Sequence, residues 1–194
     1  NYRLLLGMLR ACGVRVEDAT VGLIGAGNIG SHIIGRLRAL GVRLLVVEAR
    51  DDRRAALAAD GVRVFAPSEK LAMLGEPMDA LVVNAAGGTL DATAVGVCVA
   101  NARLAVLCGS ENLVMPDASQ VEVLRRAGKV FAPTELGGMM GYLTAVEEYL
   151  ARLEGVPFDV QTLVSAAGRL EEAGEAVTTR VLAGGHRETF AQAV

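Results

Sequence analysis

Residues 20–48 decide the fold of this chain. The stretch runs TVGLIGAGNIG from Thr20 to Gly30, continues as SHIIGRLRAL to Leu40, and ends as GVRLLVVE at Glu48. A short apolar run meets three glycines spaced G-x-G-x-x-G, a helical pattern follows, and a second apolar run ends in an acid. This order of strand, glycine turn, helix, strand and acid is typical of a dinucleotide-binding βαβ unit.

Each glycine of this turn has its own predicted task. Gly25 permits the tight turn, Gly27 lets a pyrophosphate approach the backbone, and Gly30 lets the helix pack against the strand. The helix N-terminus offers free N–H groups and the positive end of a dipole to the phosphates. The alternative is a glycine-rich turn used only for packing. The turn residues that we predict to contact a cofactor are Gly25, Ala26, Gly27, Asn28, Ile29 and Gly30.

The acid and the basic residues after it bear on which dinucleotide binds. Glu48 follows Gly30 by eighteen residues and is placed to accept hydrogen bonds from the adenosine ribose hydroxyls. We expect Ala49 and Arg50 to lie beside it, and Arg50, Arg53 and Arg54 could bind a 2′-phosphate and select NADP. The alternative is a solvated helix start with Arg50 stacked on adenine. Because Glu48 would repel a 2′-phosphate, we expect NAD rather than NADP, and the choice stays open.

The rest of the chain predicts one sheet with helices around it. Apolar blocks of four to six residues suit strands buried on both faces of a parallel sheet. We therefore expect an α/β fold of Rossmann type: a doubly wound, mostly parallel sheet of about six strands flanked by helices, with C-terminal helices after it. The predicted domain boundaries are 1–155 for the dinucleotide-binding domain and 156–194 for a helical appendage. The further strands are expected at 62–66, 78–83, 104–108 and 129–131. The further helices are expected at 3–12, 50–60, 67–71, 91–102, 116–127, 139–154 and 159–183, with Gly184-Gly185 opening a polar tail.

Composition excludes several classes of protein. Hydrophobic residues make up 52% of the 194 residues, yet no apolar run approaches the ~20 residues that a membrane span requires. The net charge of −3 comes without a basic stripe, which argues against nucleic acid as a partner. Cys12, Cys98 and Cys108 lack metal-like spacing and predict core thiols in a reducing cytoplasm. His32 and His186 have no ligand partners nearby, so we expect no metal.

A second glycine loop follows the predicted strand at 78–83. It runs from Asn84 to Asp91 with Gly87 and Gly88 inside it, and it should face the cofactor because ligands lie beyond the carboxyl ends of such strands. The alternative is a simple turn. Asp79, at the start of the strand, could orient a loop, although an acid at this position is usually a turn residue.

Four segments together carry a resemblance to a known family. They read GAGNIG at 25–30, DALVVNAAGGTL at 79–90, GSEN at 109–112 and APTELGG at 132–138. In this order and at these separations they resemble the cofactor domain of the glutamate/leucine/phenylalanine/valine dehydrogenases, closest to the leucine and phenylalanine branch. The match covers most of residues 1–155, and the final helices resemble more loosely those that return toward the family's substrate domain.

The resemblance implies an oxidoreductase of amino-acid metabolism in the cytoplasm. Members are oxidative deaminases that pass a hydride from an amino-acid Cα to the nicotinamide of NAD. It implies that the loop 25–30 holds the pyrophosphate and Glu48 the ribose. Asn84 and Ala85 match a cysteine–alanine pair beside the nicotinamide ribose, and Asn112 matches an asparagine on the nicotinamide side. The other cofactor contacts expected from these loops are Ala86, Ser110 and Glu111.

The sequence also departs from the family. Leu136 precedes Gly137-Gly138 where the family has a substrate-holding asparagine, the loop is about two residues shorter, and Asn84 replaces a cysteine. The family's catalytic lysine lies in an N-terminal domain for which this chain has no residues. The two lysines, Lys70 and Lys129, are expected to be solvated charges and not general bases.

We therefore predict no catalytic residue within the chain. The expected protein is the nucleotide half of a dehydrogenase whose catalytic domain is missing from this sequence, and whether the chain acts as an enzyme stays open. A small amino-acid or keto-acid substrate would be bound through that domain, and a homo-oligomer is one option. Two alternatives remain: a non-catalytic dinucleotide-binding or NAD(H)-sensing module, and a dehydrogenase-like enzyme whose substrate is not a simple α-amino acid.

Overall fold

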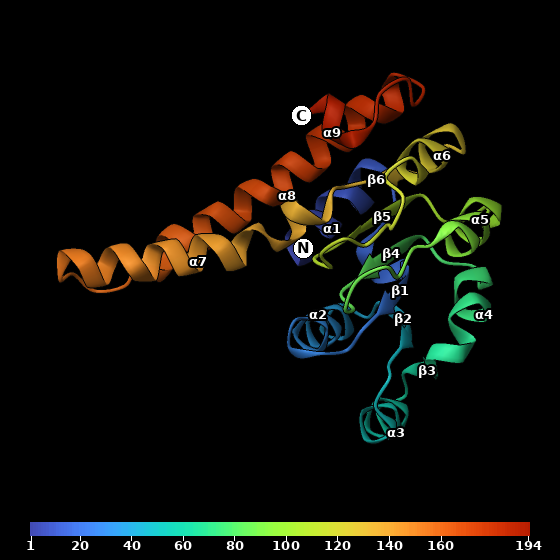
Figure 1. The fold of residues 1–194 in the computed structure, drawn as a ribbon, viewed down its shortest axis with the longest axis horizontal. Coiled ribbons are helices and arrows are strands. Elements are labelled where there is room, and N and C mark those ends of the chain that lie inside the picture. Colours follow the sequence, from blue (N-terminus) through green and yellow to red (C-terminus); the bar gives the residue numbers. More distant parts are fainter.

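One all-parallel sheet of six strands forms the centre of the molecule (Figure 1). The structure, a computed structural model, describes residues 1–194. The strand order is β3-β2-β1-β4-β5-β6. The chain adds strands to one side of β1 as far as β3, then crosses over and adds β4 to β6 on the other side of β1. The strand order therefore reverses between the neighbouring strands β1 and β4. The strands are β1 Thr20–Ile24, β2 Arg43–Val47, β3 Arg63–Phe65, β4 Ala80–Val83, β5 Val106–Gly109 and β6 Val130–Phe131. The predicted doubly wound Rossmann-type fold is confirmed.

Helices cover both faces of this sheet. The helices are α1 Tyr2–Ala11, α2 Asn28–Ala39, α3 Asp51–Ala59, α4 Lys70–Gly75, α5 Ala92–Ala100, α6 Gln120–Arg126, α7 Thr134–Glu154, α8 Val160–Ala183 and α9 Phe190–Ala193. Short 3₁₀ turns cover Val16–Asp18 and Pro67–Glu69. None of the helices is both long and apolar enough to cross a lipid bilayer.

The side chains of β1 show how the two cores arise. All five residues of this strand are buried, as the central position in the sheet requires. Successive side chains of a strand point to opposite faces. Val21 and Leu23 accordingly join the core cluster that includes residues of α1 and α2, and Ile24 joins the cluster that includes residues of α4, α5 and α6.

Helices α1 and α8 pack very closely together. A Cβ added to Gly7 would lie 2.0 Å from the carbonyl oxygen of Glu171, and one added to Gly174 would lie 2.8 Å from that of Leu4. Two glycines therefore let the two backbones touch. Around this contact Arg3 and Arg10 form ion pairs with acids of α8, at 2.8 Å and 2.7 Å from Glu171.

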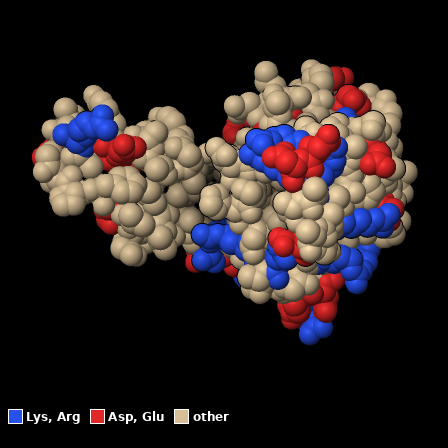
Figure 2. Space-filling model, turned by 90° about the horizontal axis from the view of Figure 1, so that it is seen from below, with Lys and Arg blue, Asp and Glu red and all other residues tan.

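Helix α7 and the first half of α8 form a hairpin that projects from the body (Figures 1 and 2). We call residues 139–168 the arm. Ala151 is its only buried residue. The large apolar side chains that it exposes are Tyr142, Tyr149, Leu150, Leu153, Val156, Phe158, Val160 and Val164.

The start of α7 differs from the expected loop at 132–138. The helix begins at Thr134, directly after Pro133, so Gly137 and Gly138 lie in its first turns. A Cβ on Gly137 would lie 1.6 Å from the carbonyl oxygen of Gly109, at the end of β5. Gly137 therefore serves a close contact between helix and strand rather than a flexible loop.

Two further expectations about elements are wrong. Pro116 does not begin α6, because Asp117 accepts a hydrogen bond from the Ser119 N–H at 2.8 Å and holds a turn before the helix starts at Gln120. The predicted polar tail contains α9, whose Phe190 is 2% exposed and belongs to the core. Its cap is formed by Thr189, which accepts a hydrogen bond from the N–H of Gln192.

Candidate functional site

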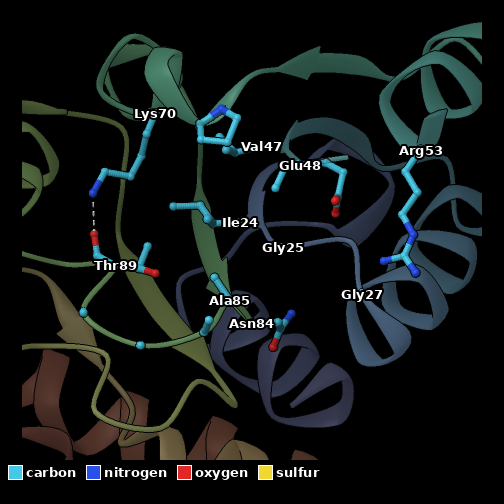
Figure 3. Close-up of a pocket in the computed structure, with 15 residues that line it drawn as sticks. Ile24, Gly25, Gly27, Val47, Glu48, Arg53, Lys70, Asn84, Ala85 and Thr89 are labelled. Carbon is cyan, nitrogen blue, oxygen red and sulfur yellow. Dashed lines mark hydrogen bonds between the residues drawn. The ribbon is translucent and has the colours of Figure 1, made fainter. Parts of the chain in front are cut away.

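A cleft opens at the carboxyl ends of β1, β2 and β4, where the strand order reverses (Figure 3). Ligands of open α/β sheets bind at this position. The cleft has a volume of about 580 Å³, within the range of small-molecule sites. Its fifteen lining residues are Ile24, Gly25, Gly27, Val47, Glu48, Ala49, Arg53, Pro67, Lys70, Asn84, Ala85, Ala86, Gly87, Gly88 and Thr89.

Seven of the fifteen predicted cofactor contacts lie in this lining. Those that line the cleft are Gly25, Gly27, Glu48, Ala49, Asn84, Ala85 and Ala86. Those outside the lining are Ala26, Asn28, Ile29, Gly30, Arg50, Ser110, Glu111 and Asn112. The cleft thus joins both glycine loops to the end of β2.

The three glycines of the first loop meet different surroundings. Gly25 has a φ of +91° and lies against the backbone of Asn84, while a Cβ on Gly30 would lie 2.0 Å from the carbonyl oxygen of Gly25. A Cβ on Gly27 would meet only the Arg53 guanidinium, at 4.0 Å. Gly25 and Gly30 are therefore required by packing, whereas Gly27 leaves space on the open side of the cleft.

Glu48 ties the end of β2 to the first glycine loop. The residue is only 5% exposed. One carboxylate oxygen accepts the Ala26 N–H at 2.8 Å and the other accepts the Arg50 N–H at 2.9 Å. Because a carboxylate oxygen can accept more than one hydrogen bond, both retain capacity toward the cleft.

Of the three arginines after Glu48, only Arg53 lines the cleft. Its Nη1 donates to the carbonyl oxygen of Ala26 at 3.2 Å. Arg50 forms two bonds with Asp52, at 3.0 Å and 2.5 Å, and this pairing lowers the pKa of the Asp52 carboxyl. Arg54 donates to the carbonyl oxygens of Glu48 and Ala49, at 2.7 Å and 2.8 Å.

Glu111 joins the loop after β4 to the loop after β5. It is 2% exposed, and its carboxylate accepts the N–H of Ala85 at 3.0 Å, the N–H of Thr89 at 2.9 Å and the Thr89 hydroxyl at 2.7 Å. The backbone adds a bond from the Gly88 N–H to the carbonyl oxygen of Leu113 at 2.9 Å. Glu111 thus shapes the cleft by holding the second glycine loop from behind.

Asn84 stands where the loops after β4 and β5 meet. Its Oδ1 accepts the N–H and the hydroxyl of Ser110, at 3.2 Å and 2.9 Å, and the side-chain amide of Asn1 at 2.6 Å. Its Nδ2 is buried without a hydrogen-bond partner. Buried polar atoms are rarely left unpaired, so this amide marks the loop junction as a candidate point of function.

Both lysines differ from the prediction of solvated charges. Lys70 lines the cleft, and its Nζ donates to the carbonyl oxygen of Thr89 at 2.8 Å (Figure 3). Lys129 is 7% exposed and donates to the carbonyl oxygens of Asn101 and Leu104, and burial lowers the pKa of its ammonium. The missed signal for Lys70 is its place just beyond the carboxyl end of β3, where side chains face the ligand edge of the sheet.

Asp79 also differs from the expected turn residue. It is 7% exposed and accepts the Thr20 N–H at 2.7 Å and the Arg103 guanidinium at 2.8 Å and 2.7 Å. These bonds fix the start of β1 beside β4, at the opposite end of the strands from the cleft. The role of Asp79 is therefore structural.

One family model matches residues 7–87 of the chain. It describes the D-isomer specific 2-hydroxyacid dehydrogenase, NAD binding domain. The valine dehydrogenase of Streptomyces albus is 28% identical over 145 residues, which cover 74% of this chain and 38% of the relative. The erythronate-4-phosphate dehydrogenase of Yersinia enterocolitica is 44% identical over 71 residues, 36% of this chain and 17% of the relative. The chain therefore spans under half of the length of these relatives.

Solved structures share the fold over nearly the whole chain. L-tryptophan dehydrogenase from Nostoc punctiforme superimposes with a TM-score of 0.77 at 16% identity, over 98% of this chain and 55% of that one. Across these comparisons the chain is similar to NAD(P)-binding domains of dehydrogenases, and over most of its length to the cofactor domain of amino-acid dehydrogenases. The relative matched over most of the chain is a valine dehydrogenase, so the expected leucine and phenylalanine branch is not distinguished from the valine branch.

Proposed function

We propose that this chain is the dinucleotide-binding domain of an oxidoreductase of the glutamate/leucine/phenylalanine/valine dehydrogenase family, in which NAD accepts a hydride from an amino acid. The observation that carries the proposal is the one cleft that joins Gly25 and Gly27, Glu48, and Asn84 to Ala86 where the strand order reverses. The pyrophosphate lies on the open side of Gly27, the adenosine ribose at Glu48, and the nicotinamide beside Asn84. The leucine, phenylalanine and valine branches are equally open within this proposal.

The choice of NAD over NADP rests on charges at the end of β2. Glu48 lines the cleft, and its carboxylate would repel a 2′-phosphate. Arg50 and Arg54 are committed to Asp52 and to backbone carbonyl oxygens, so Arg53 is the one guanidinium of the three that faces the cleft. Because Arg53 is partly engaged and stands beside the Glu48 carboxylate, the site favours the ribose hydroxyls of NAD over the 2′-phosphate of NADP.

The chemistry of the proposed reaction belongs to a second domain. Among the lining residues near the nicotinamide, the side chains of Asn84, Ala85 and Ala86 offer no general acid or base. We assign the acid–base groups and the amino-acid or keto-acid substrate site to an N-terminal catalytic domain of the full protein, with residues 1–155 binding the dinucleotide and residues 156–194 forming the helical appendage. A cytoplasmic location and a homo-oligomer complete this proposal.

The same lack of acid–base groups favours a second candidate function, a non-catalytic module that senses NAD(H). In that case the protein binds dinucleotide and transfers no hydride. Steady-state assays of the full gene product with NAD⁺ and a panel of α-amino acids separate the two candidates. NADH formation supports the dehydrogenase, and dinucleotide binding without turnover supports the sensor.

Isothermal titration of this chain with NAD⁺, NADP⁺ and NADH tests the cofactor assignment. We expect NAD⁺ to bind more tightly than NADP⁺. Glu48→Ala should weaken NAD⁺ binding by about tenfold and narrow the preference over NADP⁺, because it removes both the ribose acceptor and the repulsion. Glu76→Ala, at a surface acid paired with Arg63, is the matched control and should change neither affinity. A folded sample that binds no dinucleotide would refute the proposal.

A further inference from the structure

We infer that Lys70 and the carbonyl oxygen of Thr89 form a recognition site for the adenine base, which selects adenine over hypoxanthine. This inference rests on the proposed function, because it concerns the adenosine end of the same cleft. It begins from Lys70, a cationic side chain of the cleft lining that follows β3 in the chain.

The position of the base follows from the rest of the cleft. Gly27 leaves space for the pyrophosphate and Glu48 stands at the ribose, both at the ends of β1 and β2. Another part of the lining includes Ile24, Val47, Lys70 and Thr89, which lie on the far side of Glu48 from Arg53 (Figure 3), and the lining also contains Pro67. Its apolar side chains offer flat contact to a base, as adenine sites require.

Lys70 and Thr89 present one donor and one acceptor side by side. The Lys70 Nζ lies 2.8 Å from the Thr89 carbonyl oxygen, and 3.5 Å from a carboxylate oxygen of Asp91. An ammonium has three N–H donors, so one remains without a partner, and a carbonyl oxygen has a second lone pair. The pair therefore offers one free N–H donor on the Lys70 Nζ and one free lone pair on the neighbouring Thr89 carbonyl oxygen.

This pattern is complementary to adenine. Both base edges that carry the N6 amino group place that donor next to a ring nitrogen that accepts, N1 or N7. The ring nitrogen would accept from Lys70 and the amino group would donate to Thr89. Hypoxanthine has a carbonyl oxygen in place of the amino group and a proton on N1. In the same pose its oxygen would face the Thr89 oxygen without a proton between them, and at the N1 edge its N1–H would face the Lys70 ammonium. A site that hydrogen-bonds one group rejects the analogue that lacks it.

The contacts behind the pair keep it in place. The Thr89 N–H and hydroxyl both donate to the buried Glu111 carboxylate, so the backbone that carries the acceptor is fixed from behind. The Lys70 side chain is 22% exposed and reaches across to this backbone. The recognition site is thus formed before any ligand binds, which reduces the entropy lost on binding.

The test is the affinity of this chain for NAD⁺ and for nicotinamide hypoxanthine dinucleotide, measured by titration calorimetry. We expect the parent protein to bind NAD⁺ at least about tenfold more tightly than the hypoxanthine analogue. Lys70→Met should weaken NAD⁺ binding by about tenfold and reduce this preference, while Lys70→Gln, which keeps a donor, should retain part of it. Arg63→Met, a cation of β3 that pairs with Glu76 outside the cleft, should leave both affinities unchanged.

Each outcome has a distinct meaning. Equal affinity of the parent protein for both dinucleotides overturns the inference and leaves the proposed function intact. A Lys70→Met variant that keeps the parent's preference also overturns it, because a merely structural lysine would weaken both ligands alike. Failure of the folded parent protein to bind either dinucleotide refutes the proposed function itself.

Discussion

Gly27 and Gly30 stand three residues apart, yet their substitution by alanine should have opposite consequences. A Cβ on Gly27 meets nothing closer than 4.0 Å, whereas one on Gly30 would lie 2.0 Å from a backbone oxygen. Gly27→Ala should therefore leave the free energy of unfolding almost unchanged and weaken NAD⁺ binding by about tenfold or more, because the methyl group occupies the pyrophosphate space. Gly30→Ala should destabilise the fold by about 2 kcal/mol.

Urea unfolding and calorimetric titration of both variants check this pair. The Gly27 variant serves as the folded control for the Gly30 variant. If Gly27→Ala bound NAD⁺ as tightly as the parent protein, the pyrophosphate would not lie on the first glycine loop.

The buried thiols give a prediction about pH. Burial raises the pKa of Cys98 and of Cys108 to about 12, so neither is a thiolate at pH 8. We expect both to react with a thiol reagent at pH 8 only after unfolding. Because the folded pKa lies above the ordinary value of 9.0, these thiols stabilise the protein below pH 9, and that contribution is lost as the pH rises toward 12. Urea unfolding at pH 8 and pH 10 measures the loss, with Cys98→Ala as the variant that removes one thiol.

At the residue scale, the sequence predicted both glycine loops and Glu48 at the cleft but missed the side-chain contacts that join separate loops. The first glycine turn and Glu48 lie within one βαβ unit, so their spacing carried the prediction. Glu111 holds Thr89 across two loops, and Lys70 reaches Thr89 from the start of α4. No local pattern encodes such contacts, because they depend on which strands become neighbours.

At the scale of elements, the contact of α1 with α8 is sensitive to volume. A Cβ on Gly7 would lie 2.0 Å from the Glu171 carbonyl oxygen, so the two helices would have to separate. Gly7→Ala should lower the free energy of unfolding by about 2 kcal/mol.

Gly35, within α2, is the matched control for this change. A Cβ there meets nothing within 4 Å, and alanine favours helix over glycine, so Gly35→Ala should stabilise the protein by about 0.5–1 kcal/mol. Equilibrium urea unfolding of both variants measures whether each substitution lowers or raises the free energy of unfolding. An equal effect of the two substitutions would show that helix propensity alone decides, and would contradict the close packing.

The strands were predicted more securely than the ends of the helices. Continuous apolar runs between glycines mark strands buried on both faces, and all six were found with shifts of a few residues. Gly137 shows why a helix start was misplaced. A glycine pair normally indicates a loop, but here Gly137 is required by contact with β5, which lies far away in the sequence.

At the scale of the whole molecule, stability is unevenly distributed. The arm, residues 139–168, buries only Ala151, while the second half of α8 packs on α1. Segments with few buried contacts open with low free energy. We therefore expect amide hydrogens of 142–166 to exchange much faster than those of 174–183 within the same helical hairpin.

Hydrogen–deuterium exchange followed by mass spectrometry measures this difference. The strands β1 and β4 serve as the slowly exchanging reference. Uniform protection along α8 would show that the arm is stabilised by contacts other than those described.

Helix α8 gives the molecule a mechanical property. It is a single helix of 24 residues, about 36 Å long. Its C-terminal half packs on α1, and its N-terminal half lies in the arm beside α7 (Figure 1). Because the helix is anchored at one end, a slight tilt at its anchor produces a larger displacement at its tip. Since the anchor helix α1 also packs against the sheet, a small shift of α1 on the sheet would move the tip of the arm much farther.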